Sequence, residues 1–143
     1  MPKVTKHANG RPSWADLATS DPGASKAFYS GLFGWEADDQ PIGDGMVYSM
    51  MRLDGATSAA LYQQGPDEPG PPHWNTYVTV DDLGGSVARA RAAGAAILAE
   101  PFEVFDSGRM AVAQDPTGAI FSMWQPGEHI GAQVLNEQGH RRF

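Results

Sequence analysis

The stretch Ser13-Trp-Ala-Asp-Leu-Ala-Thr-Ser-Asp-Pro22 decides how the first half of the chain is expected to fold. Its residues up to Thr19 have the composition of a strand. Asp21 and Pro22 then indicate a helix N-terminus. Aspartate accepts a hydrogen bond from a free backbone N–H, and the missing N–H of proline costs nothing in the first turn, where N–H groups have no partner within the helix. Apolar residues recur at helical spacing as far as Leu32, before a stop at Gly34. The sequence therefore predicts a strand followed by a helix.

Further strands are expected after this helix, over residues 36–39, 46–53 and 57–62. Asp54-Gly55, between the last two, is typical of a tight hairpin turn. The second half of the chain has the same order, with strands over 74–80, 95–99, 109–114 and 119–124. Its helix, over 83–93, begins after Asp81-Asp82 and is closed by Gly94. Each half therefore reads as βαβββ.

The two halves align without a gap at an offset of 60 residues. The matching pairs lie near the ends of the predicted strands and helices. They are Pro12 and Pro72, Trp14 and Trp74, Thr19 and Thr79, Asp21 and Asp81, and Gly34 and Gly94. This agreement favours a duplicated unit, although two unrelated αβ units with similar caps remain the alternative. We expect one domain over residues 1–126, with modules at about 12–63 and 73–126, a Pro/Gly-rich linker at 64–72 and a C-terminal tail at 127–143.

Composition limits the compartment and the partners. The chain has 143 residues, no cysteine and a net charge of −7. It contains no disulfide and no thiolate metal site, and no apolar run is long enough for a membrane span. Its acidity disfavours nucleic acid and anionic membranes as partners and favours a neutral or cationic small molecule, although it also serves solubility. A cytoplasmic protein is expected.

Six short motifs give the chain a family resemblance. They are Ser20-Asp-Pro22, Ala27-Phe-Tyr29, Leu32-Phe-Gly34, Val80-Asp-Asp-Leu83, Ala92-Ala-Gly94 and Asp115-Pro-Thr-Gly118. In this order the chain resembles the vicinal oxygen chelate superfamily, which includes glyoxalases, bleomycin-resistance proteins and extradiol dioxygenases. It is most similar to one domain of actinobacterial tandem proteins that are often named hydroxylases. The resemblance implies an α+β fold in which two paired βαβββ modules form a curved, eight-stranded, incompletely closed barrel-like sheet with helices outside, and it allows a homodimer.

The resemblance also locates the positions at which related enzymes hold a metal. These positions carry Trp14, Asn75 and Ser122 in this chain. Indole has no acceptor, and amide and hydroxyl oxygens are weak ligands for first-row metals. We therefore expect no metal and no cofactor. His73 could rescue a weak site, but an exposed residue at a strand edge is the preferred interpretation. His7, His129 and His140 fall in polar terminal segments, where no ligand role is expected.

Strand alternation indicates which side chains would line a ligand cleft. The candidate ligand-binding residues are Trp14, Asp16, His73, Asn75, Tyr77, Ser122 and Trp124, and Tyr48 and Arg52 share a face that could also reach it. Two functions follow. The first is a metal-free protein that sequesters a hydrophobic or cationic small molecule between aromatic rings. The alternative is a lyase, isomerase or oxygenase-type enzyme that uses Asp16 or His73 as general base.

Overall fold

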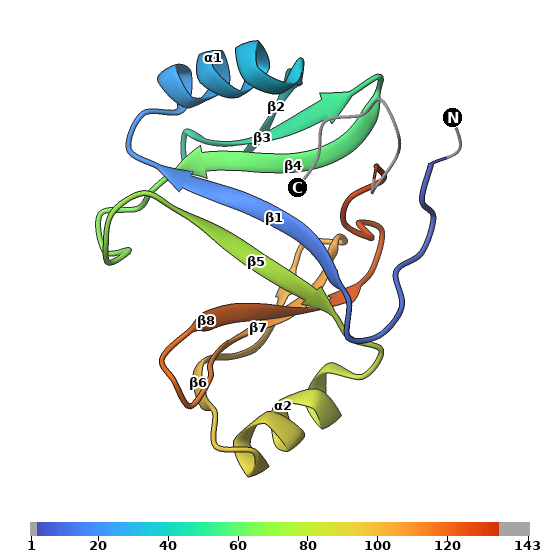
Figure 1. Ribbon diagram of the computed structural model, residues 1–143. Helices are drawn as coiled ribbons and strands as arrows, with labels where there is room; N and C mark the ends of the chain where they lie inside the picture. The colour runs from blue at the N-terminus through green and yellow to red at the C-terminus, as the bar shows by residue number, and fades with distance from the viewer. Residues whose placement is uncertain (1–2, 135–143) are drawn as a thin grey trace. The chain divides into compact units, whose positions relative to one another are not determined.

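The chain folds into two βαβββ units with the expected element order. The computed structural model describes residues 3–134 (Figure 1). Its elements are β1 (Pro12–Thr19), α1 (Pro22–Phe33), β2 (Glu36–Gly43), β3 (Met46–Leu53), β4 (Ala56–Gln63), β5 (His73–Thr79), α2 (Leu83–Ala92), β6 (Ala96–Val104), β7 (Gly108–Gln114) and β8 (Ile120–Pro126). The strands form an eight-stranded mixed sheet that is not closed into a barrel, which confirms the predicted α+β class.

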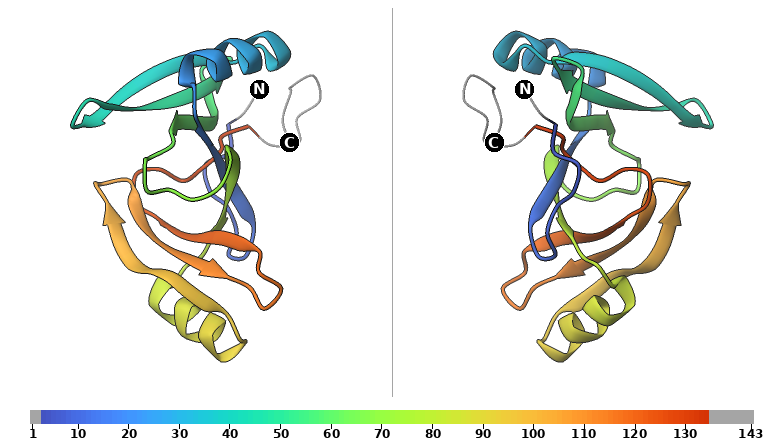
Figure 2. Two further views of the ribbon diagram at one scale, coloured as in Figure 1. Left: turned by 90° about the vertical axis from the view of Figure 1, so that its left-hand side faces the viewer. Right: turned by 90° about the vertical axis from the view of Figure 1, so that its right-hand side faces the viewer.

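Unit 1 comprises residues 15–74 together with the short stretches 3–4 and 132–134. Its strands lie in the order β2-β3-β4-β1, in which β4 is parallel to β1 and antiparallel to β3. Helix α1 packs on one face of these strands (Figure 2). The core beneath the helix consists of Leu17, Trp35, Met51, Ala59 and Leu61.

Local sequence signals explain why the elements of unit 1 begin and end where they do. The side chain of Asp21 accepts a hydrogen bond from the backbone N–H of Ala24, and Gly34 ends α1 with a left-handed φ of 75°. The hairpin between β3 and β4 turns at Asp54 and Gly55, whose φ values are 52° and 77°. Positive φ at both positions suits the right-handed twist of the flanking strands. The predicted cap, stop and hairpin are therefore all present.

Unit 2 comprises residues 5–14 and 75–131 and repeats this plan. Strand β8 lies between β5, to which it is parallel, and β7, to which it is antiparallel. Helix α2 packs against β6, β7 and β8 (Figure 2). The core beneath it consists of Val80, Leu83, Val87, Ala111, Ala113 and Met123. Among residues 3–134 no helix is long and apolar enough to cross a membrane.

Two strands are longer than the sequence pattern predicted. Strand β2 continues to Gly43 rather than ending near residue 39, so Asp38 and Asp39 lie inside a strand and not at its boundary. Strand β6 continues to Val104 rather than ending near residue 99. Almost all of β2 is exposed, and β6 pairs with β7 through two register shifts. Neither strand therefore has the regular apolar alternation that marks a strand in a sequence.

Candidate functional site

The sheet face of unit 1 opposite α1 carries a row of polar and aromatic side chains. Leu17 and Leu61 are register partners in the core beneath α1. Because side chains alternate along a strand, Asp16 and Tyr62 point to the other face. Tyr48 is the register partner of Tyr62 and joins them there. Three strands thus bring one carboxylate and two phenol groups onto the same surface.

Asp16 and Tyr48 form a hydrogen bond on this face. The Tyr48 hydroxyl donates to Oδ2 of Asp16 over 2.9 Å. Asp16 is only 2% exposed. A buried carboxylate is costly unless hydrogen bonds replace its water, so the Tyr48 hydroxyl offsets part of the cost of burying Asp16.

A second tyrosine–carboxylate pair lies beside the first. The rings of Tyr48 and Tyr62 are stacked, with centroids 6.2 Å apart and an interplanar angle of 27°. The Tyr62 hydroxyl donates to Oε2 of Glu68 over 3.0 Å. Nε2 of His73 lies 3.5 Å from the same oxygen, and Nδ1 of His73 lies 2.8 Å from the carbonyl oxygen of Pro71. That carbonyl can only accept, so Nδ1 carries a hydrogen in this arrangement.

Glu68 is the residue of this site that sequence reasoning missed. It lies in the Pro/Gly-rich linker, which was expected only to connect the two modules. The linker is held in a defined shape, because the Gln64 side chain donates to the carbonyl of Gly70 over 2.9 Å and the Gln64 backbone donates to Thr19. No periodic pattern marks a loop residue, and only the folded loop brings Glu68 to Tyr62 and His73.

Arg52 provides a positive charge in unit 1. Its Nε and Nη2 atoms donate to Oδ2 of Asp38 over 3.0 and 2.9 Å, and Nη1 donates to Thr57. A register shift between Met51 and Arg52 interrupts the β3–β4 pairing at this point. In the sequence, Arg52 shares a strand face with Tyr48 that could reach a ligand cleft. The structure instead ties its guanidinium to neighbours in β2 and β4.

The predicted aromatic residues in unit 2 gather around His129. The rings of Trp14 and His129 meet edge to face at 4.4 Å, and Trp124 lies 5.9 Å from the same imidazole. The Trp124 indole N–H donates to the His129 carbonyl over 2.8 Å. Tyr77 packs against Trp124 at 6.3 Å. Trp14 and Trp124 are each 5% exposed, so little of either indole is open to solvent.

His129 is half-buried beside the buried His7, in a segment that the sequence marks only as polar. His7 is buried, and Nε2 of His129 is buried without a hydrogen-bond partner. Burial is the main cause that lowers the pKa of His129 from 6.5 to about 4, and the neighbouring His7 lowers it further. The ring is therefore neutral at neutral pH and serves as packing between two indoles. His140 lies outside the described residues.

The residues at the family's metal positions do not suit a metal. Trp14 packs on His129, and the buried Ser122 is the register partner of Tyr77. Asn75 is half-buried. Within the described range 3–134, no three His, Asp or Glu side chains are grouped so as to hold a metal ion. Because indole offers no lone pair, this set of groups does not fit a divalent cation.

Known proteins resemble the chain at two levels. CFP32 of Mycobacterium tuberculosis, a protein provisionally named a glyoxylase, is 44% identical over 142 residues, which cover 97% of this chain and 54% of the relative. The anthracycline biosynthesis protein DnrV of Streptomyces peucetius is 36% identical over 149 residues, which cover 95% of this chain and 54% of the relative. The chain thus spans about half the length of these relatives.

The fold is similarly shared with solved structures. Methylmalonyl-CoA epimerase from Mycobacterium tuberculosis has a TM-score of 0.62 at 18% identity, covering 87% of this chain and 92% of the epimerase. This likeness establishes the architecture alone. The decisive match is a family model that aligns with residues 11–123 and so covers most of the chain. The chain belongs to the Glyoxalase/Bleomycin resistance protein/Dioxygenase superfamily.

Proposed function

We propose that this protein binds a small cationic aromatic molecule without a metal, on the face of unit 1 opposite α1. The observation that carries the proposal is the pair of stacked phenol rings, each tied to its own carboxylate. Phenol faces attract a cation, and carboxylates accept hydrogen bonds from it. The net charge of −7 adds a favourable field for such a ligand.

The residues of this face have separate roles in the proposal. Glu68 is partly exposed and pairs directly with the cationic group. Tyr48 and Tyr62 provide ring faces. Asp16 is buried, so it fixes the position of Tyr48 and makes the local potential more negative rather than contacting the ligand. DnrV, a relative named for anthracycline biosynthesis, supports a ligand of small-molecule size.

Three probes that share an indole ring test the preference for a cation. Tryptamine is a cation at neutral pH, indole is neutral, and indole-3-acetate is an anion. Isothermal titration calorimetry should give tryptamine the lowest Kd, about tenfold below that of indole-3-acetate, since a charge-assisted hydrogen bond contributes roughly 1.5–3 kcal/mol and 1.4 kcal/mol is tenfold. Equal affinity for the three probes would show that the face does not select a charge.

Two variants locate the binding. Glu68→Gln should weaken tryptamine binding by about tenfold, because it removes the pairing charge but keeps an acceptor for Tyr62. Asp106→Asn is the matched control, since it changes the net charge equally from a turn in unit 2. If Asp106→Asn weakens binding as much as Glu68→Gln, the general field and not this face attracts the ligand.

A second candidate function is proton-transfer catalysis at the same face, with His73 as general base rather than the buried Asp16. The Glu68–His73 pair favours it, because a carboxylate beside an imidazole can orient the ring for proton transfer. Incubation of a bound ligand in D₂O, followed by mass spectrometry, separates the two functions. Deuterium uptake that His73→Asn abolishes would support catalysis. A ligand recovered without deuterium would support binding alone.

A further inference from the structure

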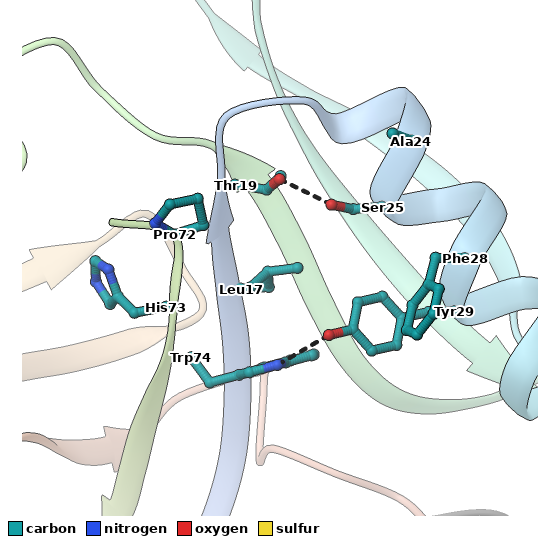
Figure 3. Close-up of a pocket in the computed structure, with 9 residues that line it drawn as sticks. All are labelled: Leu17, Thr19, Ala24, Ser25, Phe28, Tyr29, Pro72, His73 and Trp74. Carbon is teal, nitrogen blue, oxygen red and sulfur yellow. Dashed lines mark hydrogen bonds between the residues drawn. The ribbon is translucent and has the colours of Figure 1, made fainter. Parts of the chain in front are cut away.

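Unit 1 also contains a cavity on the side of the sheet that faces α1. Its volume is about 380 Å³, and it is lined by Leu17, Thr19, Ala24, Ser25, Phe28, Tyr29, Pro72, His73 and Trp74 (Figure 3). Leu17 points to this side of β1, whereas Asp16 points to the other. The cavity therefore lies on the other side of the sheet from Asp16 and Tyr48, and His73, which lines it, also pairs with Glu68. The size of the cavity falls in the range of small-molecule sites.

Aromatic rings form the apolar part of the cavity and are held in place by one another. The Trp74 indole N–H donates to the Tyr29 hydroxyl over 3.2 Å, and the two rings meet edge to face at 5.4 Å. Phe28 lies edge to face with Tyr29 at 4.9 Å and is 60% exposed. Figure 3 shows Trp74 directed toward Tyr29 and the His73 ring directed away from it. Fixed, partly exposed rings can stack on a flat apolar ligand with little loss of side-chain freedom.

Two hydroxyl groups form the polar end of the cavity. Oγ1 of Thr19 and Oγ of Ser25 lie 2.8 Å apart, and Thr19 Oγ1 also accepts a hydrogen bond from the Asp21 backbone. Thr19 is 5% exposed. The pair has two hydroxyl hydrogens and uses one between its own oxygens, so one hydrogen remains to be donated. No other acceptor for it is found among residues 3–134.

The position of this hydroxyl pair favours an acceptor on the ligand. Ser25 lies in the first turn of α1, where backbone N–H dipoles create a partial positive charge. A carbonyl oxygen would satisfy the remaining hydroxyl hydrogen and lie in that favourable field. A carboxylate fits less well, because the net charge of −7 opposes the approach of an anion.

We propose that this cavity binds a small neutral aromatic molecule that carries a carbonyl group, such as an aryl ketone. Its ring packs against Phe28, Tyr29 and Trp74, and its carbonyl oxygen accepts a hydrogen bond from the Thr19–Ser25 hydroxyl pair. Apart from His73, which lines the cavity and also pairs with Glu68, the two proposed sites share no residue.

Acetophenone and ethylbenzene test the proposal, since they share a ring and nearly the same shape but only acetophenone has the acceptor. Titration of ¹⁵N-labelled protein should shift the Trp74 indole resonance, which is assigned by its absence in Trp74→Phe. Acetophenone should bind about five- to tenfold more tightly than ethylbenzene, as expected for one hydrogen bond. Equal affinities, or shifts confined to other residues, would overturn the proposal.

Variants separate the polar and apolar parts of the site. Thr19→Val with Ser25→Ala should remove the preference for acetophenone but retain the binding of ethylbenzene. Ala24→Phe should fill the cavity and abolish both, and it keeps the test valid if the double variant fails to fold. Leu32→Ala is the control, because Leu32 is exposed on the same helix but does not line the cavity. Binding that survives Ala24→Phe, or that Leu32→Ala removes, refutes the location.

Discussion

His129 should make the native state less stable as the solution becomes mildly acidic. Burial and the nearby His7 lower its pKa in the folded chain from 6.5 to about 4. The unfolded chain therefore binds the proton first, and each proton bound only by the unfolded chain favours unfolding. Above pH 6.5 His129 is neutral in both states and lowers the free energy of unfolding little. That free energy falls as the pH falls from 6.5 towards 4. One pKa unit corresponds to about 1.4 kcal/mol, so the total loss is about 3 kcal/mol by pH 4.

The effect can be measured well above the pH at which carboxylates titrate. At about pH 5.5 the unfolded imidazole is mostly protonated and the folded one is not, which gives a loss of about 1.4 kcal/mol relative to pH 7.5. Urea unfolding of the wild type and of His129→Phe at both pH values isolates this contribution. Phenylalanine retains an aromatic ring between Trp14 and Trp124 and cannot titrate.

The difference between the two proteins decides the outcome. The free energy of unfolding of the wild type should fall by about 1.4 kcal/mol more than that of His129→Phe between pH 7.5 and 5.5. An equal fall in both proteins would mean that His129 titrates in the folded chain as it does in water. Since His7 also contributes to the low pKa, His7→Phe should reduce the effect without removing it, because burial is the larger cause.

Two further pairs of substitutions test individual contacts by urea unfolding. Tyr48→Phe should lower the free energy of unfolding by about 1–3 kcal/mol, because it removes a donor to the buried Asp16. Tyr62→Phe should lower it less, because Glu68 is partly exposed. Equal losses in the two variants would contradict this distinction. Gly131→Ala should destabilise by several kcal/mol, since its φ is +111° and its Cβ would lie 2.4 Å from the Ser13 carbonyl oxygen. Gly45→Ala, with φ +73° and open space around it, measures the cost of φ alone, and a cost equal to that of Gly131→Ala would exclude the clash.

The sequence predicted the parts of the fold that depend on local chemistry. The cap at Asp21, the stop at Gly34 and the hairpin at Asp54-Gly55 all occur, because each uses a residue type that its backbone conformation requires. The ends of β2 and β6 were not predicted. Backbone pairing with the next strands, β3 and β7, sets where those strands end, and an exposed strand does not need regular apolar alternation to pair in this way.

Strand alternation indicates which side chains share a face, but it says nothing of contacts made by loops and terminal segments. Alternation grouped Ser122 with Trp124 on one face of a strand, and in the structure Ser122 is the register partner of Tyr77. It could not show that the His129 ring contacts Trp14 and Trp124, because His129 lies in the segment after β8, outside any strand. Glu68 was missed for the same reason. The burial of a terminal or loop residue follows from long-range folding and not from the residues beside it.

The two units show how one scaffold can be used in different ways. In each unit a helix covers one sheet face with an apolar core, which the fold requires. The opposite faces differ. In unit 1 this face carries hydroxyl and carboxylate groups with remaining capacity to accept hydrogen bonds. In unit 2 its indoles are covered by His129, a neutral imidazole whose buried Nε2 has no partner. Chemistry that depends on polar groups is therefore better supported in unit 1, whereas the contacts made by Trp14 and Trp124 serve the packing of unit 2.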